Sequence, residues 1–235
     1  MKLAGQLPLP MPKPNQGRGG ARPGAGRPCK KGTVPHGRRP FHESKQPVHV
    51  TVRAIRRVGS LRRHRVAKVI GERLREVATA DRFAERRRRF RVVHFSIQPD
   101  HLHLIVEAGS AKSLSRGLQG LLLHVARLVN RRLQRRGKLF AQRFHARALA
   151  SPLEVRRAVV YVLTNAAKHP EPFADLGTLV EDGIDPCSSA PWFDGWRRPP
   201  PAKAKPPPVV APITWLLDKG WKRHGLLRRN ERPAE

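Results

Sequence analysis

Apolar residues in the middle of the chain recur with two different periodicities, one typical of strands and one typical of helices. Residues that alternate between apolar and polar predict strands at 47–55, 90–97, 101–108 and 143–149. Apolar residues at helical spacing predict helices at 60–83, 112–137 and 151–170. The resulting order, strand–helix–strand–strand–helix–strand–helix, is that of a split βαβ, ferredoxin-like plan with one added helix. We therefore expect an α+β domain with an antiparallel sheet and its helices on one face.

Residue types at the ends of the predicted helices support these boundaries. Ser151 and Pro152 have the types preferred at an N-cap and at the first helical position, and Pro170 closes the same segment. The long helix has Ser113 or Ser115 as its candidate N-cap, and Gly137 as its stop signal.

Composition changes sharply on either side of this region, so we divide the chain into 1–45, 46–170 and 171–235. The first segment is rich in Gly, Pro, Lys and Arg, and it is expected to be disordered. Its Gly-Arg-Pro steps at 17–32 suit either a minor-groove arm or a solvated cationic tail. The last segment holds a Pro-rich linker at 197–212. A short helix with two tryptophans should follow, packed on the domain or on a partner.

The charge balance narrows the partner class. The chain has 48 Lys+Arg against 17 Asp+Glu, a formal net charge of +31, and a polyanion such as nucleic acid is the expected partner. No apolar run is long enough to span a membrane, and the N-terminus lacks the features of a signal peptide. With only Cys29 and Cys187, the chain suits a reducing cytoplasm, where we expect it to associate with the nucleoid.

Two histidines lie one residue apart at the start of the strand "HLHLIVEA". Residues two apart on a strand share a face, so His101 and His103 point away from the leucines between them. Two imidazoles at this spacing can hold one divalent ion, or they can be ordinary hydrogen-bonded surface residues. Glu107 lies about 13 Å from His103 along the strand, and we leave it out of the metal shell.

The single tyrosine of the chain, Tyr161, lies on the last helix of the domain. It is about 200° around that helix from Val159, which belongs to the apolar stripe. Arg157, Asn165 and Lys168 are predicted on the same face as the tyrosine. This face combines a phenol nucleophile, an amide oxygen and two cations, although it is also compatible with an ordinary solvated face.

Taken in order, the histidine strand and the tyrosine helix resemble the single-tyrosine HUH transposases, and most closely the REP-associated tyrosine transposases. The resemblance covers roughly residues 45–170 and rests on "VHVTVRA", "SIQPDHLHLIVEA", "GKLFAQRFHARAL" and "VVYVLTNAAKH". It implies a ferredoxin-like nuclease that cuts single-stranded DNA, with His101 and His103 binding Mg²⁺ or Mn²⁺. Tyr161 would form a 5′-phosphotyrosine. Asn165 would be the third ligand, although the family often has Asn-Pro where this chain has Asn165-Ala166, and His169 is the substitute.

Cations on the tyrosine helix, the last predicted strand and the long helix are the candidate DNA contacts. They are Arg157, Lys168, Arg143, His145, Arg147, Arg131, Arg132 and Arg135. We expect single-stranded or hairpin DNA as the partner and strongly salt-dependent binding. The sequence also allows a homodimer. Two rival hypotheses remain: a non-catalytic DNA- or RNA-binding protein that keeps the fold, and a ribosome-associated RNA-binding protein suggested by charge alone.

Overall fold

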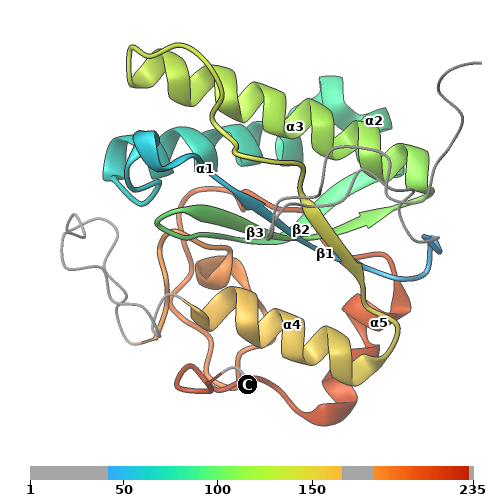
Figure 1. The fold of residues 1–235 in the computed structure, drawn as a ribbon. Coiled ribbons are helices and arrows are strands. Elements are labelled where there is room, and N and C mark those ends of the chain that lie inside the picture. Colours follow the sequence, from blue (N-terminus) through green and yellow to red (C-terminus); the bar gives the residue numbers. More distant parts are fainter. Residues whose placement is uncertain (1–41, 166–182, 233–235) are drawn as a thin grey trace, which may run out of the picture. The chain divides into compact units, whose positions relative to one another are not determined.

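A four-stranded antiparallel sheet forms the centre of the computed structural model, which describes residues 42–165 and 183–232 (Figure 1). These residues belong to the unit His36–Glu235. The strands are β1 Val48–Arg53, β2 Phe90–Ile97, β3 His101–Ala108 and β4 His145–Ala148. The helices are α1 His64–Thr79, α2 Ala84–Arg89, α3 Ala111–Arg132, α4 Pro152–Thr164 and α5 Trp215–Asp218. The strand order β2-β3-β1-β4 is the ferredoxin-like order, so the predicted fold class is confirmed.

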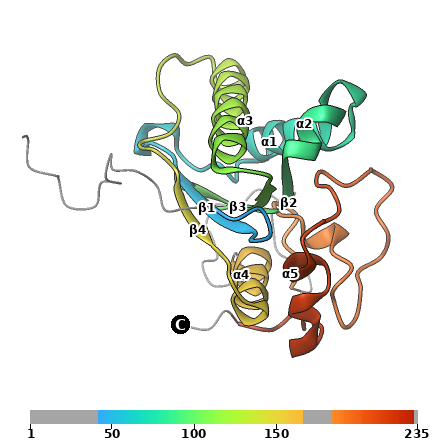
Figure 2. The same ribbon diagram turned by 90° about the vertical axis from the view of Figure 1, so that its right-hand side faces the viewer.

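The helices cover both faces of the sheet, and the prediction of helices on one face was wrong. Figure 2 shows α1 and α3 on one side of the strands and α4 and α5 on the other. Leu102, Leu104 and Val106 enter the core under α1 and α3, while Ile105 enters a second core against α4. Alternation along the strands indicates one apolar face and one polar face. In the structure Val93 and Ile105 make the second face apolar enough to bury a helix as well.

Helix capping agrees with the sequence at α4 and differs at α3. The Ser151 hydroxyl accepts a hydrogen bond from the Glu154 backbone N–H, and Pro152 follows it, as predicted. At α3 the N-cap is Ser110, not Ser113 or Ser115, and its side chain accepts from the Ser113 backbone N–H. The helix ends at Arg132, before Gly137, because the chain turns away through Gln134 at a φ of 50°.

The C-terminal segment, residues 183–232, is folded onto the domain, and parts of it lie along the outer edge of β2. Ile97 donates its backbone N–H to Cys187, and the Phe95 carbonyl accepts from Ser189. Further along, Val210 of the Pro-rich stretch donates to Val92. The segment therefore pairs with an edge strand that would otherwise expose unsatisfied backbone groups. Trp221 is buried against α4, which confirms that the tryptophan segment packs back on the domain.

Two buried carboxylates fasten this segment to the sheet. The guanidinium of Arg62 donates to both oxygens of Asp185, at 3.0 and 2.9 Å, with both side chains about 95% buried or more. Glu107 accepts hydrogen bonds from the backbone N–H groups of Ile213 and Thr214 and from the Thr214 hydroxyl. Thr214 is the N-cap of α5. Glu107 thus has a structural partner, in agreement with its exclusion from the metal site.

Among residues 42–165 and 183–232, no helix is both long and apolar enough to cross a bilayer.

The Arg62–Asp185 pair makes a stability prediction. Asp185→Ala should lower the free energy of unfolding by about 3–5 kcal/mol, because it leaves a buried guanidinium without its counter-ion. Urea unfolding followed by circular dichroism measures the loss. Glu85→Ala, which removes the exposed partner of Arg88, is the control and should cost less than about 1 kcal/mol. Equal losses in the two variants would contradict the role given to the buried pair.

Candidate active site on the histidine face of the sheet

The antiparallel register places the histidine pair beneath α4. His101 lies opposite Arg53 of β1, and His103 lies opposite Thr51. His103 is 3% exposed, whereas His101 is half-buried at the end of the strand. Both rings lie on the face that carries Ile105, as the spacing predicted.

The two imidazoles converge through their Nε2 atoms, which are 2.8 Å apart. Their Nδ1 atoms are held from behind: Asp100 Oδ1 lies 2.6 Å from His101 Nδ1, and Thr51 Oγ1 lies 3.1 Å from His103 Nδ1. If each Nδ1 carries the proton, both Nε2 lone pairs point into the same space. Hydrogen bonds at the second nitrogen are how metal-binding histidines are usually oriented.

A third histidine, His49, joins the cluster from β1. Its Nε2 lies 3.1 Å from His103 Nδ1, so it also contacts the back of the His103 ring. The sequence pattern places His49 in a strand and indicates no role for it. The available signal was the alternation of "VHVTVR", which puts His49 and Thr51 on one face, but only the pairing with β3 reveals which neighbours they meet.

Tyr161 lies over this cluster. Its ring centroid is 5.0 Å from that of His103 and 5.8 Å from that of His49, in edge-to-face arrangements. Buried residues surround α4 on several sides, because the sheet covers one side and the segment around Trp221 covers another. Tyr161 is consequently half-buried at the border of the apolar surface, next to the histidines that the sequence paired with it.

The predicted third ligand is only partly located. Asn165 follows Tyr161 by one turn, and its backbone N–H donates to the Tyr161 carbonyl at the C-cap of α4. Its side chain is buried and makes no hydrogen bond to His101 or His103. His169 and Lys168 lie outside the described residues. Across residues 42–165 and 183–232, no group of three His, Cys, Asp or Glu side chains is arranged to hold a metal ion.

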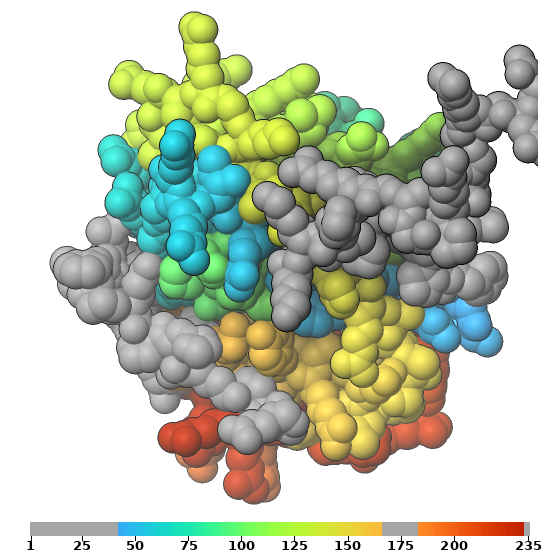
Figure 3. Space-filling view, viewed as in Figure 1, coloured from blue at the N-terminus to red at the C-terminus, as the bar shows by residue number. Residues whose placement is uncertain are grey.

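The cations of β4 share the face of the histidines. His145 pairs with Thr51 and so extends the row that begins at His103, while Arg147 pairs with His49 and extends the row that begins at Ile105. In Figure 3 the yellow surface of β4 continues into that of α4. Arg143 and His145 are exposed, and Arg147 is exposed while donating to Glu154 at 2.9 Å.

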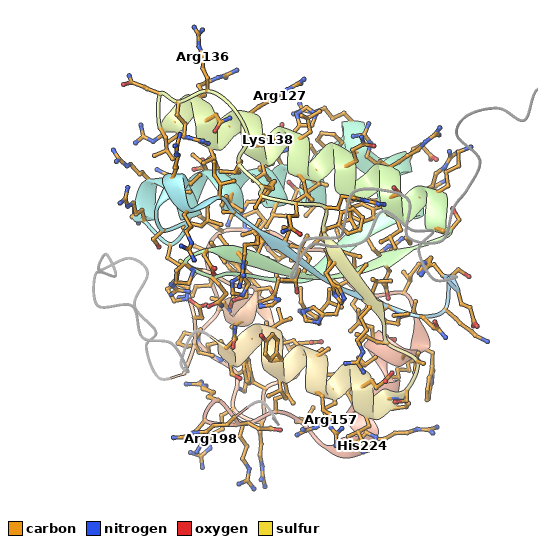
Figure 4. The ribbon with its side chains drawn as sticks, viewed as in Figure 1. Arg127, Arg136, Lys138, Arg157, Arg198 and His224 are labelled. Carbon is orange, nitrogen blue, oxygen red and sulfur yellow. The ribbon has the colours of Figure 1, made fainter. Side chains whose placement is uncertain are left out.

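The candidate DNA contacts of the long helix are not brought together with the histidines. Arg131, Arg132 and Arg135 belong to the α3 end, and α3 covers the opposite face of the sheet. Figure 4 shows Arg127 and Arg136 on the α3 side and Arg157 on the α4 side. Arg135 also has a local role, because it donates to the Lys138 carbonyl at 3.0 Å.

Burial keeps the inner histidines neutral. It lowers the pKa of His103 to about 2, with a further contribution from the charges of His101 and His49. It also lowers the pKa of His49 to about 4, assisted by Arg147, His145 and His101. A neutral imidazole is the form that can bind a metal ion.

Comparison with known proteins identifies the family. The family model described as "Transposase IS200 like" matches residues 43–162, more than half of the chain, and includes the histidines and the tyrosine. The chain belongs to the IS200-like transposase family. The resemblance of its motifs to the single-tyrosine transposases is therefore confirmed.

One solved structure is also similar to this transposase. It is described as the structure of the REP-associated tyrosine transposase bound to a REP hairpin. The match covers 66% of this chain and 90% of that chain, with 16% identity and a TM-score of 0.43. A likeness this distant carries no argument about the site. No curated protein matches the transposase.

The buried histidines predict a loss of stability in acid. Burial lowers the pKa of His94 to about 4, as for His49, while the unfolded side chain titrates near 6.5. Between these values the unfolded chain binds protons that the folded chain does not, so the free energy of unfolding should fall as the pH falls. Each such histidine contributes up to about 1.4 kcal/mol per pH unit.

Urea unfolding of the wild type and of His94→Gln between pH 4 and 6.5 measures this slope. The slope of the free energy of unfolding against pH should be smaller in the variant by up to about 1.4 kcal/mol per pH unit, whatever the variant's stability at neutral pH. An unchanged slope would show that His94 is not held neutral in the folded protein.

Proposed function

We propose that this transposase nicks and rejoins single-stranded DNA at a hairpin or repeat, with Tyr161 as the nucleophile. The observation that carries the proposal is the contact of the Tyr161 ring with His103, whose Nε2 atom converges with that of His101. Residues more than 50 positions apart in sequence are joined there into a nucleophile beside a candidate metal site.

The donor set suits a divalent ion such as Mg²⁺ or Mn²⁺. His101 and His103 would be two of its ligands, and the amide oxygen of Asn165 or the ring of His169 would be the third. Asp100 and Thr51 support the fit, because they bind the rear nitrogens and so orient both rings. When bound, the ion supplies Lewis-acid chemistry at a non-bridging phosphate oxygen.

Tyr161 carries the covalent chemistry. Its phenolic oxygen would bond to the phosphorus while the bond from phosphorus to the 3′-oxygen breaks. The phenolic proton passes to solvent, and the departing 3′-oxygen takes up a proton to become a free hydroxyl. The product is a 5′-phosphotyrosine, which retains the bond for later rejoining. Because Tyr161 replaces water as the first nucleophile, the site needs no carboxylate base for this step.

The β4 cations would hold the DNA strand at the site. His145 and Arg147 lie on the same sheet face as His103, where they can contact phosphates near the scissile one. Arg157 precedes Tyr161 by one helical turn and is exposed, so it would contact the strand from α4. Lys168 and Arg143 remain candidates for the same role.

The assembly and location of the transposase are part of the proposal. Within the described residues, β4 is an edge strand with no strand on its outer side, so it offers backbone groups to a second copy. A homodimer formed there would set two sites near each other. Binding to DNA would associate the protein with the nucleoid of the cytoplasm.

A covalent-adduct assay tests the proposed nucleophile. Wild-type protein incubated with hairpin-containing single-stranded DNA and Mg²⁺ should form a covalent adduct that survives denaturing electrophoresis. Tyr161→Phe should abolish the adduct, because it removes the attacking oxygen while keeping the ring that packs on His103. Binding by the variant, measured by fluorescence anisotropy, should stay close to that of the wild type. Tight binding without any adduct in the wild type would instead support a non-catalytic DNA-binding protein.

Metal titration tests the proposed role of the histidine pair. Titration of the transposase with Mn²⁺, followed by electron paramagnetic resonance, should show one tight site that His101→Ala removes. Asp100→Ala should weaken binding by about 10- to 100-fold, because the His101 ring loses the group that orients it. The matched control is His224→Ala, at a histidine on the far side of α4 (Figure 4). If all three variants bind Mn²⁺ like the wild type, the histidine pair is not a metal site.

A further inference from the structure

A cationic groove lies between α2 and α3, away from the histidine face. It has a volume of about 770 Å³. Five cationic side chains line it: Arg82, Arg86, Arg89, Lys112 and Arg116. All five are exposed, and Glu85 is the one carboxylate among the described residues that line the groove.

Most of this charge is not neutralised by the protein. Glu85 is paired with Arg88, and Arg82 is paired with Glu76. In the portion of the chain that the structure describes, no carboxylate lies within 4.0 Å of a cationic nitrogen of Arg86, Arg89, Lys112 or Arg116. Holding like charges together without counter-ions is unfavourable, so the groove is electrostatically prepared for an anion.

The floor of the groove consists of small residues over a buried ring. Gly117 and Gly120 of α3 line it together with Phe90, the first residue of β2. A Cβ atom on Gly117 would lie 2.2 Å from the Phe90 ring, so only glycine allows α3 to approach the strand this closely. At Gly120, by contrast, nothing lies within 4 Å of an added Cβ atom, so the surface of α3 is open there.

The groove is remote from the histidine pair. Phe90 pairs with Ala108, at the opposite end of β3 from His101. Ala108 is seven steps along the strand from His101, which is about 23 Å. The groove also lies in the α1–α3 layer, whereas Tyr161 lies in the α4 layer. The few nucleotides around a phosphate at Tyr161 therefore cannot occupy the groove as well.

We propose that the α2–α3 groove binds the phosphate backbone of a second DNA segment in duplex form, separate from the strand that is cut. Arginine predominates among its cations, and its planar guanidinium suits phosphate oxygens. Phe90 is the only aromatic residue among the described ones that line the groove. It is buried and cannot stack on bases, which is how single strands are usually held. Phosphate contacts alone suit a duplex stem, whose backbone they position without sequence readout. This inference uses the proposed function only in taking the polyanion to be DNA.

The test measures duplex binding in a Tyr161→Phe background, in which no strand transfer can interfere. Fluorescence anisotropy with a labelled 20-base-pair DNA, repeated over a range of salt concentrations, gives the affinity and its salt slope. Neutralising Arg86, Arg89 and Arg116 to Gln should reduce the slope by about 2 to 3, because each phosphate contact contributes about one unit. Neutralising Arg136, Lys138 and Arg198, which are exposed elsewhere (Figure 4), removes the same charge and should change the slope by less than one unit.

A second pair of variants tests the groove with a single residue. No atom lies within 4 Å of a Cβ placed on Gly120, so a side chain fits there without a clash. Gly120→Glu puts a negative charge in the groove and should weaken duplex binding several-fold relative to Gly120→Gln, which has the same bulk. This pair decides the question if the triple variant does not fold, because replacing a helical glycine favours the helix.

Equal slopes for the two triple variants, or equal affinities for Gly120→Glu and Gly120→Gln, would overturn the proposal. So would a groove-dependent preference for an RNA duplex of the same sequence, which would assign the surface to another partner. Adduct formation on a single strand is a separate measurement. If the adduct fails while the groove variants lose duplex binding, the proposed chemistry is wrong and the groove assignment stands.

Discussion

The antiparallel register between β3 and β1 is the constraint on which the rest of the transposase depends. It sets His103 opposite Thr51 and leaves Leu102 and Leu104 in the core under α1 and α3. Because side chains alternate along a strand, a slip of one residue would bury the histidines among leucines and expose the leucines beneath α4. The apolar cost of that exchange keeps the register in place. The same register continues through β4, so His103, Thr51 and His145 form one row across three strands.

The candidate active site on the second face of the sheet depends on α4, which is held in place from two sides. Val93 and Ile105 bind the helix to the sheet, and the segment around Trp221 packs on its other side. Two buried carboxylates, Asp185 and Glu107, fasten that segment to the strands. The position of Tyr161 over His103 thus depends on residues beyond the end of the predicted domain, from Asp185 to Trp221. A rigid support of this kind is what a nucleophile needs to stay aligned with a phosphate.

Much of this architecture could be predicted because it depends on local periodicity. The strands at 90–97 and 101–108 agree with β2 and β3 to the residue, since their alternation and the Pro-Asp turn between them are local signals. The pairing of histidine strand with tyrosine helix was also visible as a motif. His49 was missed because its role comes from a cross-strand neighbour that no local pattern reveals. Arg131 and Arg132 were predicted as DNA contacts from their charge alone, and helix charge does not indicate which face of the sheet the helix covers.

The measurement that tests the central claim most directly is the identification of the residue that carries DNA after cleavage. The adduct formed on a hairpin substrate is digested with nuclease and trypsin, and its peptides are sequenced by mass spectrometry. The account predicts a nucleotide joined through its 5′-phosphate to Tyr161, within the tryptic peptide 158–168. Nucleotide on another residue, or complete cleavage with no modified peptide, would contradict the assignment of Tyr161 as the nucleophile.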